Sequence, residues 1–312
     1  MKIKQLILTL STIVLAGSLM LTSCRKKKEK EEDPDSDQTE AAENNLAENM
    51  MNDVAGIGSQ GSENGSLSTY RLGDNNDVFL SVCASITTNT VAKTFTVDFG
   101  STPCLCLDGK MRSGKLMFDY FNSTNGAVAY RMSGYKCVIT TTSLSPYVVD
   151  GYTVNIINKT IENTTPLSSV SPTLTAGAML TWSVSANVNI IKPSGGGTVS
   201  WNCTRTKKLL NTNDTACYKG QSIPINWKKA KIQLDGSANG MTASGNNYTS
   251  VITALVRDFK TCDPTVKRYP FISGKIDFTP GTKATRYIDF GSGTCDYSGT
   301  ITIKGITYTF NF

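Results

Sequence analysis

Apolar and polar residues alternate along most of the chain after residue 78. The clearest run is Leu180, Trp182, Val184, Ala186, Val188 and Ile190, which alternate with threonine, serine and asparagine. A period of two gives a strand one apolar face and one wet face. Shorter runs lie at 95–99, 116–120, 152–156, 199–203 and 301–312. Helical periods do not separate the runs, so the pattern predicts an all-β body at 78–312, a large antiparallel β-sandwich or meander.

Residues 38–57 follow a different period. The apolar positions recur at helical spacing: Leu46, Met50, Val54 and Ile57. This spacing predicts an amphipathic N-terminal helix over 38–57. Asp37 and Glu40 resemble a capping box, and Gly56 and Gly58 are expected to end the helix. An apolar stripe usually packs on a core, so we expect the helix to lie on the body; a recognition helix for a partner is the alternative.

Two stretches of the body are near copies. Residues 97–101 read Val-Asp-Phe-Gly-Ser, residues 288–292 read Ile-Asp-Phe-Gly-Ser, and a cysteine follows each aspartate by six residues. The repeat predicts two related halves, 78–200 and 201–312. In each copy we expect the phenylalanine to point inward and the aspartate to accept hydrogen bonds from the turn that glycine permits. Apolar parity also flips across Lys304-Gly305, which predicts a hairpin turn or a bulge.

The first 23 residues have the pattern of a secretory signal peptide. Two lysines, Lys2 and Lys4, precede an apolar run that extends to Leu21. Residues 21–24, Leu-Thr-Ser-Cys, resemble the lipobox of bacterial lipoproteins. That resemblance implies cleavage before Cys24, lipidation of its thiol and acylation of the new amino terminus with a chain such as palmitate. Cys24 and the charged run that follows, 24–37, would then form a lipidated tether too polar to fold.

Further short motifs carry a wider resemblance. They are Asn52-Asp53 at the helix, the stretch 96–100, the stretch 108–115 and the stretch 289–296. Together they are similar to a group of uncharacterised lipoproteins of Bacteroidota, which implies an exported, lipid-anchored, β-rich protein and carries over no catalytic residue. Arg25 after the lipidated cysteine implies the outer membrane under the lipoprotein sorting rule. Lys30-Glu31-Glu32 resembles a surface-export signal; a solvated spacer without an address is the alternative.

Composition removes several classes of chemistry. The chain has no histidine, which is the commonest general base and a usual ligand of catalytic zinc. The formal net charge is +6, and removal of Lys2 and Lys4 with the signal lowers it by two. A net positive charge this small does not indicate nucleic-acid binding. We therefore expect no catalytic residue, no metal, no cofactor and no nucleic-acid partner.

The nine cysteines fit an oxidising compartment. With Cys24 assigned to the lipid, eight disulfide candidates remain: Cys83, Cys104, Cys106, Cys137, Cys203, Cys217, Cys262 and Cys295. The repeat predicts a Cys262–Cys295 bond, and it pairs Cys83 with Cys104 or Cys106. The other member of that pair would meet Cys137, and Cys203 with Cys217 would close a polar stretch. A zinc site from Cys104, Cys106 and Cys137 is the alternative, although the sequence has no Cys-x-x-Cys pair there.

Function follows only in outline from these observations. The leading prediction is a non-enzymatic, lipid-anchored cell-envelope protein of structural or binding role, attached to the membrane at Cys24 and facing a polysaccharide or an envelope protein. The alternatives are a surface polysaccharide-binding module and a carboxylate-based glycoside hydrolase. Exposed aromatics along a groove would favour the first alternative, and two close carboxylates in a pocket would favour the second. Trp182 and Trp201 share parity with core residues, which leaves Trp227 as the freer tryptophan.

Overall fold

The computed structural model describes residues 39–64, 84–106, 108–167, 179–221, 223–262 and 271–311. The predicted signal peptide at 1–23, the lipidated cysteine and tether at 24–37, and Cys83 lie outside these residues. The described residues belong to one compact unit.

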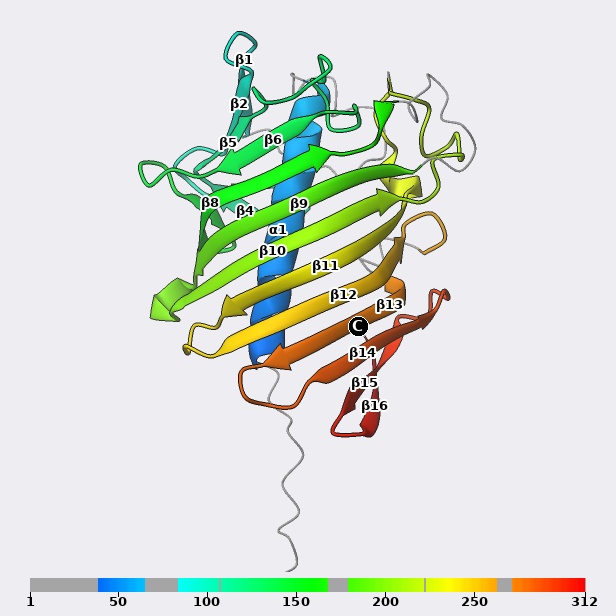
Figure 1. The fold of residues 1–312 in the computed structure, drawn as a ribbon. Coiled ribbons are helices and arrows are strands. Elements are labelled where there is room, and N and C mark those ends of the chain that lie inside the picture. Colours follow the sequence, from blue (N-terminus) through cyan, green and yellow to red (C-terminus); the bar gives the residue numbers. More distant parts are fainter. Residues whose placement is uncertain are drawn as a thin grey trace, which may run out of the picture. The chain divides into compact units, whose positions relative to one another are not determined.

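The described strands form one 16-stranded antiparallel sheet in which most strands pair with their neighbours in the sequence (Figure 1). The strands of the first part are β1 (Ser85–Asn89), β2 (Thr94–Asp98), β3 (Cys104–Leu105), β4 (Met111–Ser113), β5 (Lys115–Asp119), β6 (Lys136–Thr140), β7 (Tyr147–Val149) and β8 (Tyr152–Asn163). The later strands are β9 (Leu180–Ile191), β10 (Thr198–Leu209), β11 (Lys231–Met241), β12 (Asn247–Asp258), β13 (Phe271–Pro280), β14 (Arg286–Ser292), β15 (Ser298–Ile303) and β16 (Ile306–Asn311). Two 3-10 turns are η2 (Pro193–Gly195) and η3 (Trp227–Lys229). The predicted all-β meander is therefore confirmed, with the short strands β3, β4 and β7 forming a side branch.

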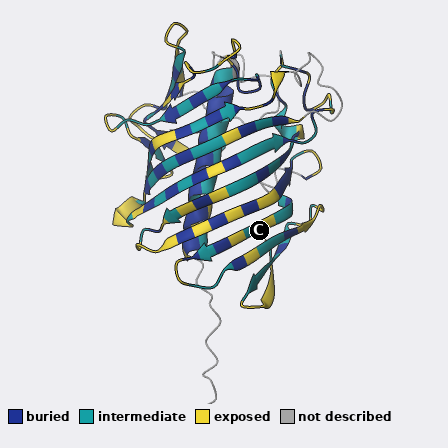
Figure 2. Cartoon of the chain, viewed as in Figure 1, coloured by how far each residue is buried: buried dark blue, intermediate teal, exposed yellow. Residues whose placement is uncertain are grey.

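Alternation along the strands separates the two faces of the sheet, as Figure 2 shows in bands of buried and exposed residues. The predicted apolar positions of β9 point inward, and Leu180, Trp182, Val188 and Ile190 are fully buried. β9 pairs with β10 over twelve residues, from Leu180 opposite Leu209 to Ile191 opposite Thr198. Because the long central strands keep one face apolar, they need a covering layer on that face.

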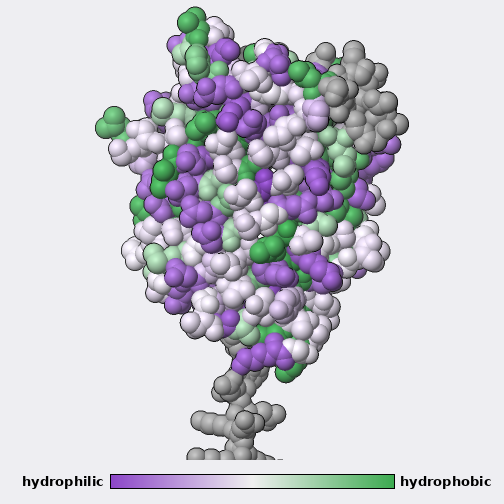
Figure 3. All heavy atoms as spheres, in the orientation of Figure 1, coloured by the Kyte–Doolittle hydropathy of each residue, from purple (hydrophilic) through white to green (hydrophobic). Residues whose placement is uncertain are grey.

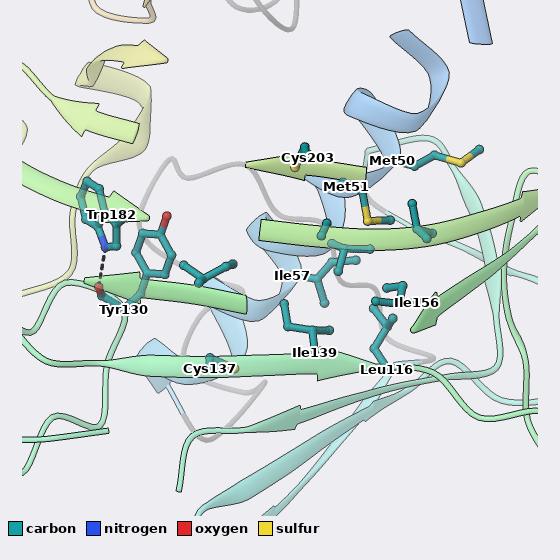
Figure 4. Close-up of a cluster of buried hydrophobic side chains, with 14 of the residues drawn as sticks. Met50, Met51, Ile57, Leu116, Tyr130, Cys137, Ile139, Ile156, Trp182 and Cys203 are labelled. Carbon is teal, nitrogen blue, oxygen red and sulfur yellow. Dashed lines mark hydrogen bonds between the residues drawn. The ribbon is translucent and has the colours of Figure 1, made fainter. Parts of the chain in front are cut away.

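The helix α1 (Thr39–Asn64) supplies that layer by crossing the strands on one face of the sheet. Its apolar stripe is buried in a single core that includes the tryptophans of β9 and β10 (Figure 4). The expectation that the helix packs on the body is confirmed. The predicted end at residue 57 is wrong, because the helix continues through Gly58 and Gly61. A Cβ at Gly58 would lie 2.7 Å from a ring carbon of Phe118, so this glycine lets the helix approach the ring rather than ending it.

The two copies of the Asp-Phe-Gly-Ser stretch end β2 and β14 in the same way. The Asp98 carboxylate accepts a hydrogen bond from Gly100 N–H at 2.8 Å, and the Asp289 carboxylate accepts one from Gly291 N–H at 2.9 Å. The phenylalanine that follows each aspartate is buried. The local account of the repeat is confirmed. The hairpin predicted at Lys304-Gly305 is confirmed as well, because both residues have positive φ between β15 and β16.

The predicted halves at 78–200 and 201–312 are not separate units of the structure. The boundary falls inside β10, which is hydrogen-bonded along its length to β9 on one side and β11 on the other. A domain boundary belongs in a segment that few contacts cross. The near copies are therefore two instances of one turn at different places in a continuous sheet.

The structure confirms one of the predicted disulfide bonds and contradicts two others. Cys262 and Cys295 form a disulfide with Cα atoms 5.5 Å apart, as predicted. Cys104 is also in a disulfide. Cys203 and Cys217 are not bonded to each other: both are buried thiols. β10 runs on from Cys203 to Leu209, about 20 Å at the usual rise of a strand, before the chain turns toward Cys217.

The proposed bond between Cys137 and the second cysteine of the Cys-Leu-Cys pair is wrong too. Cys106 and Cys137 are both buried thiols. Cys137 lies on β6, between β5 and β8, whereas Cys106 follows β3 on the side branch. The alternative zinc site at Cys104, Cys106 and Cys137 is excluded, since Cys104 is committed to a disulfide.

The sheet face in view in Figure 3 is covered mainly by hydrophilic and neutral residues, with hydrophobic residues scattered among them. This matches the serine, threonine and asparagine positions of β9, which point away from the core. Within the described ranges, no helix combines the length and the apolar character that crossing a membrane requires.

Candidate functional site

A cavity of about 140 Å³ lies between α1 and the central strands of the sheet. Its helical wall includes Met51 and Ala55 of α1, and its sheet wall comes mainly from β10 and β11. Tyr130 and Trp227 also line it. We call it the α1–sheet cavity.

β10 gives the cavity an unusual sequence of inward-facing side chains. Trp201, Cys203, Arg205 and Lys207 alternate along the strand and all line the cavity. The next two inward positions after Trp201 and Cys203 are therefore occupied by cationic side chains. A charged residue at an inward position is costly unless something compensates its charge.

Two further cations reach the cavity because β-bulges change which face their side chains occupy. The register between β8 and β9 shifts between Ile156 and Asn158, so Lys159 points inward although strict alternation from Ile156 would turn it outward. A shift in β12 between Thr253 and Val256 turns Arg257 inward in the same way. Bulges commonly redirect a side chain at a functional site.

The bulge in β12 is held by a specific contact with β11. The Asp235 carboxylate accepts a hydrogen bond from Ala254 N–H at 2.8 Å, and Ala254 has a positive φ of 48°. Gly274 on the neighbouring strand β13 also has a positive φ, and a Cβ there would lie 2.3 Å from the Ala254 carbonyl oxygen. The local sequence therefore builds this irregularity into the sheet, and with it the inward position of Arg257.

Negative charge in the cavity wall is scarce. Glu48 of α1 is the one carboxylate among the described residues that line the cavity, and it pairs with Arg205 at 2.9 Å. Within the described part of the chain, Arg205 Nε and Nη1 and the Asn52 side-chain nitrogen are buried without a hydrogen-bond acceptor. Lys159 is 3% exposed and has no hydrogen bond or ion pair to a described residue. The Gln60 side-chain oxygen also lines the cavity and is buried without a described donor, so the wall offers more unmatched donors than unmatched acceptors.

Lys207 occupies an aromatic cage formed by Tyr130, Trp182 and Trp227. Its ammonium lies 4.2 Å from the Trp227 ring centroid and 5.4 Å and 5.6 Å from the Tyr130 and Trp182 centroids. The Trp182 indole N–H in turn donates to the Tyr130 carbonyl oxygen at 2.9 Å, which fixes the cage (Figure 4). Burial, together with the charges of Arg257 and Lys159, lowers the pKa of Lys207 to about 7. Burial also lowers the pKa of Lys159.

We expect the free energy of unfolding to rise between pH 7 and about pH 8.5. Lys207 has a pKa of about 7 in the folded chain and 10.5 as a free side chain, so in this window the unfolded chain holds a proton that the folded chain has lost. Raising the pH then favours the folded chain, by at most about 1.4 kcal/mol per pH unit for one group. Above pH 9 the buried thiols oppose the trend, because burial raises the pKa of Cys137, Cys203 and Cys217 above the ordinary value.

Urea denaturation between pH 6 and 8.5 tests this expectation. The groups facing Lys207 are the Tyr130 hydroxyl, the cations Lys159 and Arg257, and the rings of the cage, so no carboxylate obscures its titration among the residues that the structure places there. Lys207→Met should remove most of the rise and leave only the part that the lowered pKa of Lys159 contributes, whereas Lys275→Met, at an exposed lysine, should keep it whole. Parallel pH profiles for Lys207→Met and the unchanged chain would contradict the assignment.

The other site residues proposed from the sequence do not meet at one place. Trp182 and Trp201 are buried in the core as predicted, and Trp227 covers Lys207 instead of forming an open platform. Exposed aromatic rings on the sheet do not share a face either: Tyr287 and Tyr308 have opposite parity in the register of β14, β15 and β16. Across the described ranges, no group of three or more cysteine, aspartate or glutamate side chains is placed to hold a metal ion.

The sequence contained part of the signal for the α1–sheet cavity. Arg205 and Lys207 extend the apolar parity of 199–203 into charged residues, which marks an inward position of unusual chemistry. Lys159 and Arg257 gave no such signal, since their positions depend on bulges. Comparison with protein families, with curated proteins and with solved structures finds no match to this chain. The functional argument therefore rests on the residues themselves.

Proposed function

We propose that this chain is a lipid-anchored cell-envelope protein of the bacterial lipoprotein type, held at the outer membrane through Cys24, whose body binds a small molecule in the α1–sheet cavity. The observation that carries the binding role is the cavity itself: a partly open, largely apolar space of about 140 Å³ lined by the buried cations Lys159, Arg205 and Arg257 together with Lys207. Cavities with a few convergent polar groups and shifted pKa values are the usual sites of small ligands.

The geometry favours this role over the two alternatives. A polysaccharide chain needs an open surface, and the tryptophans that would bind one are buried or cover Lys207. A glycoside hydrolase needs a carboxylic acid with a raised pKa beside a second carboxylate. The described part of the cavity wall has Glu48 alone, and Asp98, Asp214 and Asp296 have pKa values that are lowered by hydrogen bonds.

The anchor is tested by replacing Cys24 with alanine and separating membrane from soluble material. We expect Cys24→Ala to lose stable attachment, because one or more acyl chains at this thiol would supply the membrane affinity. Ser23→Ala, which keeps a small residue beside the cleavage point, should stay in the membrane fraction. An equal membrane fraction for Cys24→Ala and the unchanged chain would exclude lipid at this residue as the anchor.

Binding is tested with three probes of benzene size, because a cavity of about 150 Å³ accepts benzene. The purified chain is titrated by calorimetry with benzoate, benzyl alcohol and benzylamine, and emission from Trp201 and Trp227 in the cavity wall provides a second readout. We expect saturable binding of at least one probe. Ala55→Phe should fill the cavity and abolish binding, while Ala42→Phe, at an exposed position of the same helix, should leave binding unchanged. Absence of binding by all three probes would contradict the proposed role.

A further inference from the structure

We propose that the ligand of the α1–sheet cavity is a compact organic anion: a carboxylate on an apolar body about the size of one ring. This inference rests on the proposed binding function and narrows it to a ligand class. It follows from the excess of unmatched donors in the wall and from the apolar side chains that line the cavity with them.

The position of the carboxylate follows from the donors. Arg205 uses Nη2 for Glu48, and its Nε and Nη1 hydrogens have no acceptor within the described residues. Lys159 is close enough to Glu48 and Arg205 for their charges to act on its pKa. Buried donors and charges without partners are costly, and an anionic oxygen is the partner that satisfies both cations at once. The carboxylate therefore belongs between Arg205 and Lys159, beside the Asn52 side-chain nitrogen.

Lys207 contributes in a different way. Its ammonium already faces the rings of the aromatic cage and lies 3.4 Å from the Tyr130 hydroxyl. Its pKa of about 7 makes it a cation below that pH, and a cation held by ring faces gives this end of the cavity a positive potential without requiring an ion pair. It adds to the attraction for an anion, whereas a cationic ligand would meet like charges on both sides.

The apolar body of the ligand follows from the remaining wall. Met51 of α1, Val184 of β9 and Leu234 of β11 face the space together with the Trp201 ring. Inorganic phosphate would satisfy the donors but would leave this apolar wall in contact with water. A ring-sized acid fits both the donors and the apolar side chains, and the volume of about 140 Å³ limits the body to roughly one ring with a small substituent.

The test compares four probes on the purified full chain by calorimetry: benzoate, benzyl alcohol, inorganic phosphate and glucuronate. We expect benzoate to bind about tenfold or more tightly than benzyl alcohol or phosphate, because only benzoate uses both parts of the wall. Tighter binding of glucuronate than of benzoate would overturn the proposed apolar acid and would indicate an acidic sugar as the ligand. Equal binding of benzoate and benzyl alcohol would overturn the anion while leaving the proposed binding role intact. Failure of every probe here and in the three-probe series would remove the binding role itself.

Two variants should move benzoate affinity in opposite directions. Lys159→Met removes a buried charge that has no described partner, so it should weaken benzoate binding about tenfold and raise the melting temperature of the ligand-free chain. Glu48→Gln removes the competing carboxylate from Arg205 and should tighten benzoate binding about threefold or more. Lys275→Met is the matched control and should change neither. A Lys159→Met variant that is less stable and binds benzoate normally would show that Lys159 has a structural role, and would overturn the proposal.

Discussion

Replacing Arg112 with methionine is expected to lower the free energy of unfolding by about 3–5 kcal/mol, the largest effect we expect from a single substitution. Arg112 on β4 is fully buried. Its guanidinium donates to both carboxylate oxygens of Asp108, at 2.6 Å and 2.7 Å, and its Nε donates to the Tyr147 hydroxyl at 3.0 Å. Its Nη2 also lies 3.7 Å from a carboxylate oxygen of Asp53, on α1. Without Arg112, the largely buried Asp108 carboxylate loses its bidentate partner, while Asp53 keeps its ion pair with Lys110.

Urea denaturation of three variants separates this effect from a simple loss of packing. Arg112→Met/Asp108→Leu removes both partners and should recover much of the lost stability, because no buried charge is left unpaired at that pair. Lys115→Met breaks a partly exposed ion pair with Asp98 and should cost no more than about 1 kcal/mol. If Arg112→Met lowers the free energy of unfolding by less than about 1 kcal/mol, the contacts of Arg112 with Asp108 and Asp53 do not stabilise the packing of α1 on the side branch of the sheet.

Removing the Cys262–Cys295 disulfide is the second large effect. The bond links residues 33 apart in the sequence, between the end of β12 and the segment after β14. A cross-link of this length restricts the unfolded chain, and the chain-entropy relation gives about 3–4 kcal/mol. The double variant Cys262→Ala/Cys295→Ala should lower the free energy of unfolding by this amount. Cys217→Ala, at a buried thiol without a bond, is the control and should cost about 1 kcal/mol. Equal stability of the double variant and the control would show that the cross-link does not stabilise the chain.

The fold was largely predictable from the sequence because period-two patterns report directly on strands. β9 is a clear example: its alternating residues fall on the predicted faces. The Lys304-Gly305 hairpin was predictable because the parity of the apolar residues changes there. The disulfide at Cys262 was predictable from the spacing of the near copies, although the sheet runs on without a break at the predicted boundary between the halves.

The features that the sequence did not predict depend on tertiary contacts. Glycine usually weakens a helix, but Gly58 and Gly61 face the rings of Phe118 and Phe95, and their lack of side chains allows α1 to continue to Asn64. Lys159 and Arg257 reach the α1–sheet cavity only because β8 and β12 each contain a bulge. Alternation alone assigns both residues to the opposite face, so the convergence of cations was invisible to it.

The central claim is that the α1–sheet cavity holds an organic anion, and a crystal of the purified chain soaked with 4-bromobenzoate tests it most directly. Anomalous scattering locates the bromine atom independently of the model for the ligand. The account predicts one bromine peak between α1 and β9–β11, beside Met51 and Leu234, with the carboxylate oxygens within hydrogen-bond distance of Arg205 and Lys159. A bromine peak elsewhere on the chain, or an empty cavity at concentrations that saturate binding in solution, would contradict it.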